Sequence, residues 1–167
     1  MKTLAPLLIA GLVCACAPAK PASTAAEVTG ADDIAIGRYL TRIGGCNDCH
    51  TPGYLKADGK IPESQWLTGN PVGFRGPWGV SYASNLRLTA ESISEGDWVS
   101  MLANRTDTPP MPWPSTHAMS DANRRALYHY IRSLGPAGKA APLPLCLASE
   151  KPATPYVDMV PITPDAH

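Results

Sequence analysis

The first clear pattern of apolar positions lies in residues 31–43, ADDIAIGRYLTRI. Three of its apolar residues follow one another at spacings of 4 and 3, which places them on one face of a helix: Ile36, Leu40 and Ile43. Asp32 and Asp33 stand in the opening turn, where negative charge interacts favourably with the helix dipole. Gly44 and Gly45 follow directly and are typical of a helix end. The pattern predicts a first helix over residues 31–43.

A second amphipathic pattern covers residues 121–134, DANRRALYHYIRSL. Its apolar stripe consists of Leu127, Tyr130, Ile131 and Leu134. Ser120 is a suitable N-cap, and Gly135-Pro136 ends the helix. We expect this stripe to pack on the first helix near Leu40, whereas His129 lies off the stripe and is expected to be solvated.

The rest of the chain predicts one more short helix and much loop. Residues 92–104 carry three apolar residues at helical spacing, Trp98, Met101 and Leu102. Residues 51–90 have many glycines and prolines and no sustained period, which predicts a long loop. Four prolines exclude residues 107–119 from a helix. Residues 137–167 read as a proline-rich tail, either packed on the surface or loose. No stretch is rich in strand signals, so a mostly α fold is expected.

The chain begins with an apolar run that is too short to cross a membrane. Lys2 gives this run a positive start, and residues 3–15 are almost entirely apolar, against the roughly 20 residues that a spanning helix needs. Residues 1–16 are therefore interpreted as a secretory signal peptide. Cys16 ends the run between two alanines, which resembles a bacterial lipoprotein signal whose cysteine is lipidated. The alternative is ordinary cleavage after Ala19.

These boundaries divide the chain into four parts and predict its location. After the signal, residues 17–30 are mainly Ala, Pro, Ser and Thr and form a flexible tether. Residues 31–136 form the one folded domain, and residues 137–167 form the tail. We expect the protein in the periplasm, anchored to a membrane through a lipid on Cys16.

Composition and charge narrow the possible functions. The sequence has 14 basic and 14 acidic residues and no basic stripe, so nucleic-acid binding has no electrostatic footprint. Aromatic residues make up 7% and Phe occurs once, so a bound cofactor would supply apolar volume that the side chains lack. One local cluster of positive charge consists of Arg124, Arg125 and Arg132. It is either a docking patch or a solvated helix face.

The candidate chemistry lies directly after the first helix, in the sequence Cys46-Asn47-Asp48-Cys49-His50. Cys-x-x-Cys-His is the pattern of covalent haem c attachment. Two thiols add across the two haem vinyl groups, and the spacing lets both sulfurs face the porphyrin edge. The next residue, His50, then points under the ring, where its imidazole binds the iron.

Three other uses of this motif are less well supported by the sequence. A structural zinc site needs two further Cys or His ligands at paired spacing, and no second pair exists. A thiol–disulfide centre normally belongs to a strand–helix setting that the sequence does not predict. A structural disulfide suits an exported protein but gives no role to the adjacent His50.

The methionines after the signal are the candidates for the second axial ligand of the haem iron. Met111 lies in a proline-stiffened loop, Pro109-Pro110-Met111-Pro112-Trp113-Pro114, which has little freedom to lose and presents a thioether rigidly. The alternative is that Met111 fills a gap beside Trp113. His117 is the rival distal ligand. The other methionines are assigned to packing or to the tail, namely Met101, Met119 and Met159.

Together these features resemble the class I c-type cytochromes over residues 31–135. The shared order is a first helix, the haem motif, variable loops, Met111 and a last amphipathic helix, with Tyr130 at the place of that helix's aromatic residue. Three further segments look like single-haem domains that serve as subunits or partners of periplasmic dehydrogenases: GPWGVSYASNL, PPMPWP and YIRSLGPAG.

The resemblance implies helices and long loops wrapped around one covalent haem c, with His50 as proximal and Met111 as distal ligand. Met/His ligation leaves the iron six-coordinate, so the implied function is electron transfer and not catalysis. Its partners would be redox proteins: a periplasmic dehydrogenase or quinol-oxidising donor, and an oxidase or another cytochrome. The alternative is a haem enzyme or gas sensor with an open or displaceable distal site.

Several residues remain with less certain roles. Pro52 is expected to stiffen the loop after His50, where a backbone carbonyl would orient the imidazole. Trp78 and Asn85 either cover the haem propionates or serve packing and turn formation. Cys146 has no obvious partner and is either buried, free or used between chains.

Overall fold

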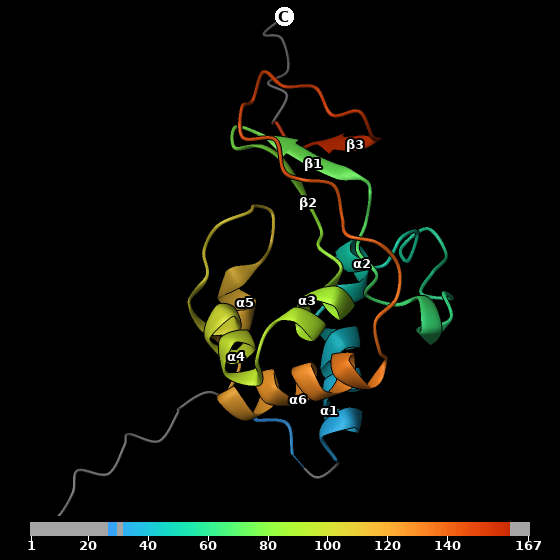
Figure 1. Cartoon of the computed structure of the whole chain (residues 1–167), viewed down its shortest axis with the longest axis vertical. Helices are drawn as coiled ribbons and strands as arrows, with labels where there is room; N and C mark the ends of the chain where they lie inside the picture. Colours follow the sequence, from blue (N-terminus) through green and yellow to red (C-terminus); the bar gives the residue numbers. More distant parts are fainter. Residues whose placement is uncertain (1–26, 30–31, 161–167) are drawn as a thin grey trace, which may run out of the picture.

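The computed structural model describes residues 27–29 and 32–160 of the chain. Figure 1 shows a group of helices with a small sheet at the opposite end of the molecule from α1 and α6. In chain order the elements are α1 Asp33–Ile43, α2 Cys46–His50, η1 Glu63–Gln65, β1 Gly73–Gly76, β2 Gly79–Tyr82, α3 Leu86–Ser92, α4 Glu95–Asn104, α5 Trp113–His117, α6 Asp121–Ser133 and β3 Tyr156–Asp158. The mostly helical fold and the three helices expected from periodicity are confirmed.

Side-chain caps explain where the main helices begin. The first N–H groups of a helix have no partner within it, and a short polar side chain before the helix accepts from one of them. Four helices, α1, α3, α4 and α6, use this device, with the caps Asp32, Asn85, Ser94 and Ser120. The predicted cap Ser120 is thus confirmed, because its hydroxyl accepts from the Asn123 amide at 3.2 Å.

Helices α1 and α6 cross in close contact and form the base of the core (Figure 1). Their buried apolar side chains belong to one cluster, which includes Ile36, Leu40, Leu127, Tyr130 and Ile131. The predicted packing of the last helix on the first is therefore confirmed. Ile43, expected on the same face, is instead 60% exposed at the last position of α1.

The crossing of α1 and α6 depends on the absence of a side chain at Gly37. A Cβ at this position would lie 2.1 Å from the Ala126 carbonyl oxygen and 2.5 Å from the Tyr130 Cβ, so the two backbones could not approach as they do. Gly37 lies inside α1 and is buried. A glycine inside a helix destabilises that helix, and the close packing that Gly37 permits offsets this loss.

The long loop expected over residues 51–90 is partly wrong, because it contains a β-hairpin and most of α3. Strand β1 pairs antiparallel with β2 and parallel with β3, which gives the sheet order β2-β1-β3. The two hairpin strands have only four residues each, too few for an alternating pattern to stand out, and β1 begins and ends with glycine. Helix α3 begins inside the same region because Asn85 caps it.

A second correction concerns residues 107–119, which were excluded from helix. Helix α5 occupies Trp113–His117, with Pro114 at its second position. The N–H groups of a first helical turn have no partner within the helix, so a proline there removes no hydrogen bond. The prediction that no helix forms is confirmed for residues 109–112, directly before Trp113.

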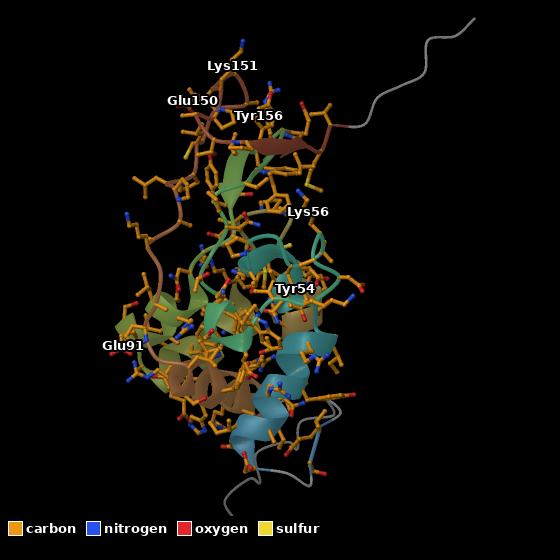
Figure 2. The ribbon with its side chains drawn as sticks, turned by 90° about the vertical axis from the view of Figure 1, so that its right-hand side faces the viewer. Tyr54, Lys56, Glu91, Glu150, Lys151 and Tyr156 are labelled. Atoms are coloured by element: carbon orange, nitrogen blue, oxygen red, sulfur yellow. The ribbon has the colours of Figure 1, made fainter. Side chains whose placement is uncertain are left out.

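The described part of the tail is packed against the domain. We call residues 137–160 the C-terminal segment; it runs from the end of α6 to the sheet at the other end of the molecule (Figure 1). Val80 and Leu145 exchange backbone hydrogen bonds of 2.8 and 2.9 Å, and β3 adds a strand beside β1. Figure 2 shows Tyr156 beside this sheet, with Glu150 and Lys151 in the turn before it.

The predicted signal and all of the tether except residues 27–29 lie outside the described residues, as do residues 161–167. Within the tether, the Val28 amide donates to the Asn123 side chain at 3.2 Å. Among the residues that the structure describes, none of the helices is long and apolar enough to cross a membrane.

His129 links three helices and is not simply solvated as expected. Its Nδ1 donates to Asp33 of α1 at 2.8 Å and its Nε2 donates to Glu95 of α4 at 2.8 Å. Both ring nitrogens carry a proton in this arrangement, so the imidazolium form is favoured. The hydrogen bond to Glu95, followed by that to Asp33, raises the pKa of His129 above its usual value.

We predict that Gly37→Ala lowers the free energy of unfolding by at least about 2 kcal/mol, because the new methyl group meets the α6 backbone. Chemical denaturation of the purified protein measures this. Gly96→Ala is the matched control, since Gly96 lies in α4 and the nearest atom to its added Cβ is Ser94 Oγ at 3.8 Å. The control should be neutral or stabilising by up to about 1 kcal/mol. Equal stability of both variants would contradict the close crossing.

We predict that His129 stabilises the fold more at low than at high pH. A raised folded-state pKa means that the contribution is fully present below the unfolded pKa of about 6.5 and is lost as pH rises through the folded value. The unfolding free energies of wild type and His129→Gln should therefore differ near pH 6 and converge near about pH 9. The difference should stay below about 1 kcal/mol, because these ion pairs are partly exposed. A pH-independent difference would refute the link.

Candidate haem site

The cysteine motif forms the short helix α2, which follows α1 after a change of direction. Gly44 ends α1, and its N–H donates to the Leu40 carbonyl at 2.8 Å. Gly45 then adopts φ 67°, in the left-handed region that favours glycine, and is the N-cap of α2. One helical turn places Cys46 and Cys49, three residues apart, on the same side of α2. The two glycines therefore set the direction in which both thiols project.

Both thiols are free, partly buried and uncharged. Burial raises the pKa of the Cys46 thiol to about 11, and burial together with the charge of Asp48 raises the pKa of Cys49. A thiol–disulfide centre needs a thiolate with a lowered pKa, so these raised pKa values disfavour that alternative. Across residues 27–29 and 32–160, no three His, Cys, Asp or Glu side chains are grouped to hold a metal ion.

His50 is buried, neutral and held by one hydrogen bond. Its Nδ1 lies 2.7 Å from the Ser84 carbonyl oxygen, which can only accept, so Nδ1 carries the proton and Nε2 keeps its lone pair. Burial lowers the pKa of His50 below its usual value. A neutral imidazole with one nitrogen bonded to a carbonyl is the usual form of a metal-binding histidine. A carbonyl was expected from the loop at Pro52; it comes instead from Ser84.

A buried polar network fixes α2 against the following chain. The Thr51 hydroxyl donates to the Asn47 side-chain oxygen at 2.6 Å and accepts from the Leu67 amide at 2.8 Å. The His50 carbonyl accepts from the Gly69 amide at 2.8 Å. These bonds hold the backbone of the motif, so the imidazole is positioned at both its ring and its backbone.

Met111 lies in a loop that is held at several points. It is partly buried against the core cluster. Its N–H donates to the Thr108 carbonyl at 3.3 Å and its carbonyl accepts from the Trp113 amide at 2.9 Å. The Ser81 hydroxyl of β2 donates to the carbonyl of Pro109. A loop fixed in this way can present the thioether with little loss of conformational freedom.

The other candidates for the distal position have different surroundings. Met101 and Met119 pack against the core, as expected, and Met159 in the C-terminal segment is 41% exposed. His117, the rival distal ligand, uses Nε2 to bond the Arg105 carbonyl at 2.8 Å. This contact occupies the nitrogen that projects farthest from the backbone.

The residues present fit a covalently bound haem. They offer two neutral thiols on one helical turn, a neutral imidazole with a free Nε2 lone pair, and a thioether in a stiffened loop. A hollow of about 460 Å³ is lined in part by Ser84 and Thr108. The carbonyls of these two residues accept from His50 and from Met111. The hollow is thus bordered by residues that hydrogen-bond the two predicted ligands, whereas Cys46, Cys49, His50 and Met111 do not line it.

Two important residues gave no signal in the sequence. Ser84 acts through its backbone carbonyl, which any residue possesses, so only the fold reveals it. Ser81, which is 4% exposed, acts through a side chain, but nothing in its neighbourhood marks it as the partner of a loop 28 residues away. Neither position could have been found from spacing or periodicity.

Other residues singled out from the sequence have structural surroundings. Asn85 is 3% exposed and caps α3, and Trp78 donates to the Phe74 carbonyl at 3.2 Å; both make contacts of packing and turn formation. Arg124 is 6% exposed and cannot belong to a surface patch, because it donates to the backbone carbonyl oxygens of α5. Cys146 is a free, exposed thiol.

Comparison with known proteins adds one finding. The family model described as Cytochrome c matches residues 34–135, which is more than half of the chain. No curated protein and no solved structure gave a match. The matched range begins in α1, contains the Cys46-to-His50 motif and Met111, and ends directly after α6. The chain therefore belongs to the cytochrome c family, whose members bind haem c and transfer electrons.

Proposed function

We propose that this chain is an exported cytochrome c with a single haem that carries one electron at a time between other redox proteins. The observation that carries the proposal is His50: a buried, neutral imidazole whose Nδ1 is bonded to the Ser84 carbonyl, directly after two uncharged thiols on one helical turn. Cys46 and Cys49 would form the covalent attachments, and His50 Nε2 would be the proximal ligand.

Met111 is proposed as the distal ligand. Its loop is fixed by hydrogen bonds from Ser81 and to Thr108, and it is stiffened by the prolines on either side. Haem bound in this way supplies a one-electron iron couple, and a thioether ligand raises its reduction potential. With both axial positions held by the protein, substrates have no place at the iron, which favours an electron carrier over an enzyme.

The N-terminal sequence supports a membrane-tethered location. A signal peptide over residues 1–16 and a lipid on Cys16 would leave the domain in the periplasm on the tether of residues 17–30. A tether raises the effective concentration of the domain near membrane-bound partners. We propose a dehydrogenase or quinol-oxidising complex as the electron donor and an oxidase or another cytochrome as the acceptor.

We predict a c-type absorption spectrum with the marks of His/Met ligation. The purified mature protein should show a weak thioether-to-iron band when oxidised and no response to carbon monoxide when reduced. Met111→Ala should lose the weak band and bind carbon monoxide, because one axial position is then open. Met119→Ala is the matched control, since Met119 is also partly buried against the core, and it should keep the band.

Two results would contradict the proposal in different ways. Prompt binding of carbon monoxide by the unaltered protein would show an open distal site and favour a haem enzyme or gas sensor. Absence of covalent haem after expression with the cytochrome maturation machinery would refute the site as a whole.

We predict that the unaltered protein is found in the membrane fraction and that Cys16→Ser moves it to the soluble periplasmic fraction. The substitution removes the thiol that would carry the lipid. Cys14→Ser is the matched control and should leave the protein at the membrane. Fractionation and the mass of the mature N-terminus measure both effects. A mature chain that begins at Lys20 would instead show ordinary cleavage after Ala19.

A further inference from the structure

We propose that the C-terminal segment is a working part of the haem site: it holds in place the residues that orient both predicted axial ligands. The segment, residues 137–160, lies beyond residues 34–135 that match the family, so family membership does not account for it. The inference rests on the proposed ligands His50 and Met111. It adds a positioning role for Asn85, for β2 and for the segment itself.

The first connection runs through Asn85 to His50. The Asn85 side chain is almost fully buried, and its Nδ2 donates to the carbonyls of Ala137 at 2.7 Å and Lys139 at 3.1 Å. Its Oδ1 accepts from the Leu88 amide at the start of α3. The preceding residue is Ser84, whose carbonyl accepts from His50 Nδ1. One amide group therefore joins the beginning of the segment to the peptide that orients the imidazole.

The second connection runs through β2 to the Met111 loop. Val80 and Leu145 exchange two backbone hydrogen bonds, so the segment extends β2 on its open side. The fit is close, because a Cβ at Gly79 would lie 2.0 Å from the Leu145 carbonyl oxygen. The next residue of the strand, Ser81, donates through its hydroxyl to the carbonyl of Pro109. The position of β2 thus determines where the Met111 loop is held.

The far end of the segment is fastened to the hairpin. Strand β3 lies parallel to β1, and Figure 2 shows Tyr156 at this edge of the sheet. Arg75 forms an ion pair with Asp158 at 3.2 Å, and the Tyr82 hydroxyl and Thr154 Oγ1 lie 3.0 Å apart. Each of these exposed or half-buried contacts is weak. Together they hold the segment at a second place, so the middle part at Leu145 is fixed between two anchored ends.

The C-terminal segment positions the two predicted ligands without touching them. When a histidine binds a metal, a hydrogen bond to its other ring nitrogen fixes the orientation of the imidazole and raises its basicity. Loss of such a partner typically lowers metal affinity or activity about 10- to 100-fold. The segment acts one step farther out, because it holds Ser84 and Ser81 and not the ligands themselves. Loosening it would free the His50 imidazole on one side and the Met111 loop on the other, while the α1–α6 core stays intact.

Two variants of the full-length haem protein test the two connections. Asn85→Asp keeps an oxygen to cap α3 but replaces the donor to Ala137 and Lys139 by a carboxylate that repels both carbonyls. We expect the exchange of the His50 Nδ1 proton with solvent, followed by proton NMR, to become about 10-fold faster. Asn104→Asp is the matched control, since it makes the same change at an exposed position whose Nδ2 donates only to Ser100.

Leu145→Pro removes the single N–H that donates to the Val80 carbonyl and leaves the Leu145 carbonyl in place. We expect added imidazole to displace Met111 from the oxidised iron about 10-fold more readily, measured by loss of the thioether band. Leu147→Pro is the control, because Leu147 is exposed and its amide donates only to the Glu150 side chain.

The outcomes separate the two proposals. If the unaltered protein shows no thioether band, the proposed His50/Met111 ligation fails. If the band is present and both variants match wild type in proton exchange and imidazole binding, the segment has no positioning role and this inference is overturned. A variant that loses covalent haem supports the inference if circular dichroism shows its helices unchanged and its matched control keeps the haem; loss of the helices as well contradicts it, because the α1–α6 core is expected to stay intact.

Discussion

The close crossing of α1 and α6 at Gly37 is the constraint on which the other elements depend. Because no side chain separates the two backbones there, the end of α1 has a fixed position relative to α6. Gly44 and Gly45 then turn the chain into α2, which carries both thiols and His50. The end of α6 is the point from which the C-terminal segment starts toward the sheet. One helix contact thus determines where the cysteine motif begins and where the C-terminal segment departs.

Burial gives the site its chemical character. The same loss of solvent raises the pKa of both thiols and lowers the pKa of His50, so every group offered to the haem is uncharged near neutral pH. Ion pairs that join different elements lie elsewhere, for example those of His129 and Arg132 among the helices and that of Arg75 on the sheet. Charge therefore contributes to holding the elements together, whereas the site relies on neutral donors and backbone carbonyls.

The sequence allowed helices α1, α4 and α6 and the chemistry of the motif to be predicted, because both depend on the spacing of residues close together in the chain. The apolar stripe that contains Leu127 and Tyr130, the cap Ser120 and the run from Cys46 to His50 each lie within a few consecutive turns of chain. The hairpin of β1 and β2 could not be predicted because its strands have only four residues each, and the pairings of Gly73 with Tyr156 and of Val80 with Leu145 join residues far apart in the sequence. The hydrogen-bond partner of His50 could not be predicted either, because any residue at the position of Ser84 would offer the same backbone carbonyl.

The order of these parts along the chain has a consequence for assembly. Cys46, Cys49 and His50 precede β2 and Ser84, and the C-terminal segment follows them all. During synthesis, the motif leaves the ribosome before the residues that pair with Val80 and Asn85. The two thiols proposed to carry haem are therefore synthesised while the hairpin still has an open edge, and the C-terminal segment can close that edge only as the last step.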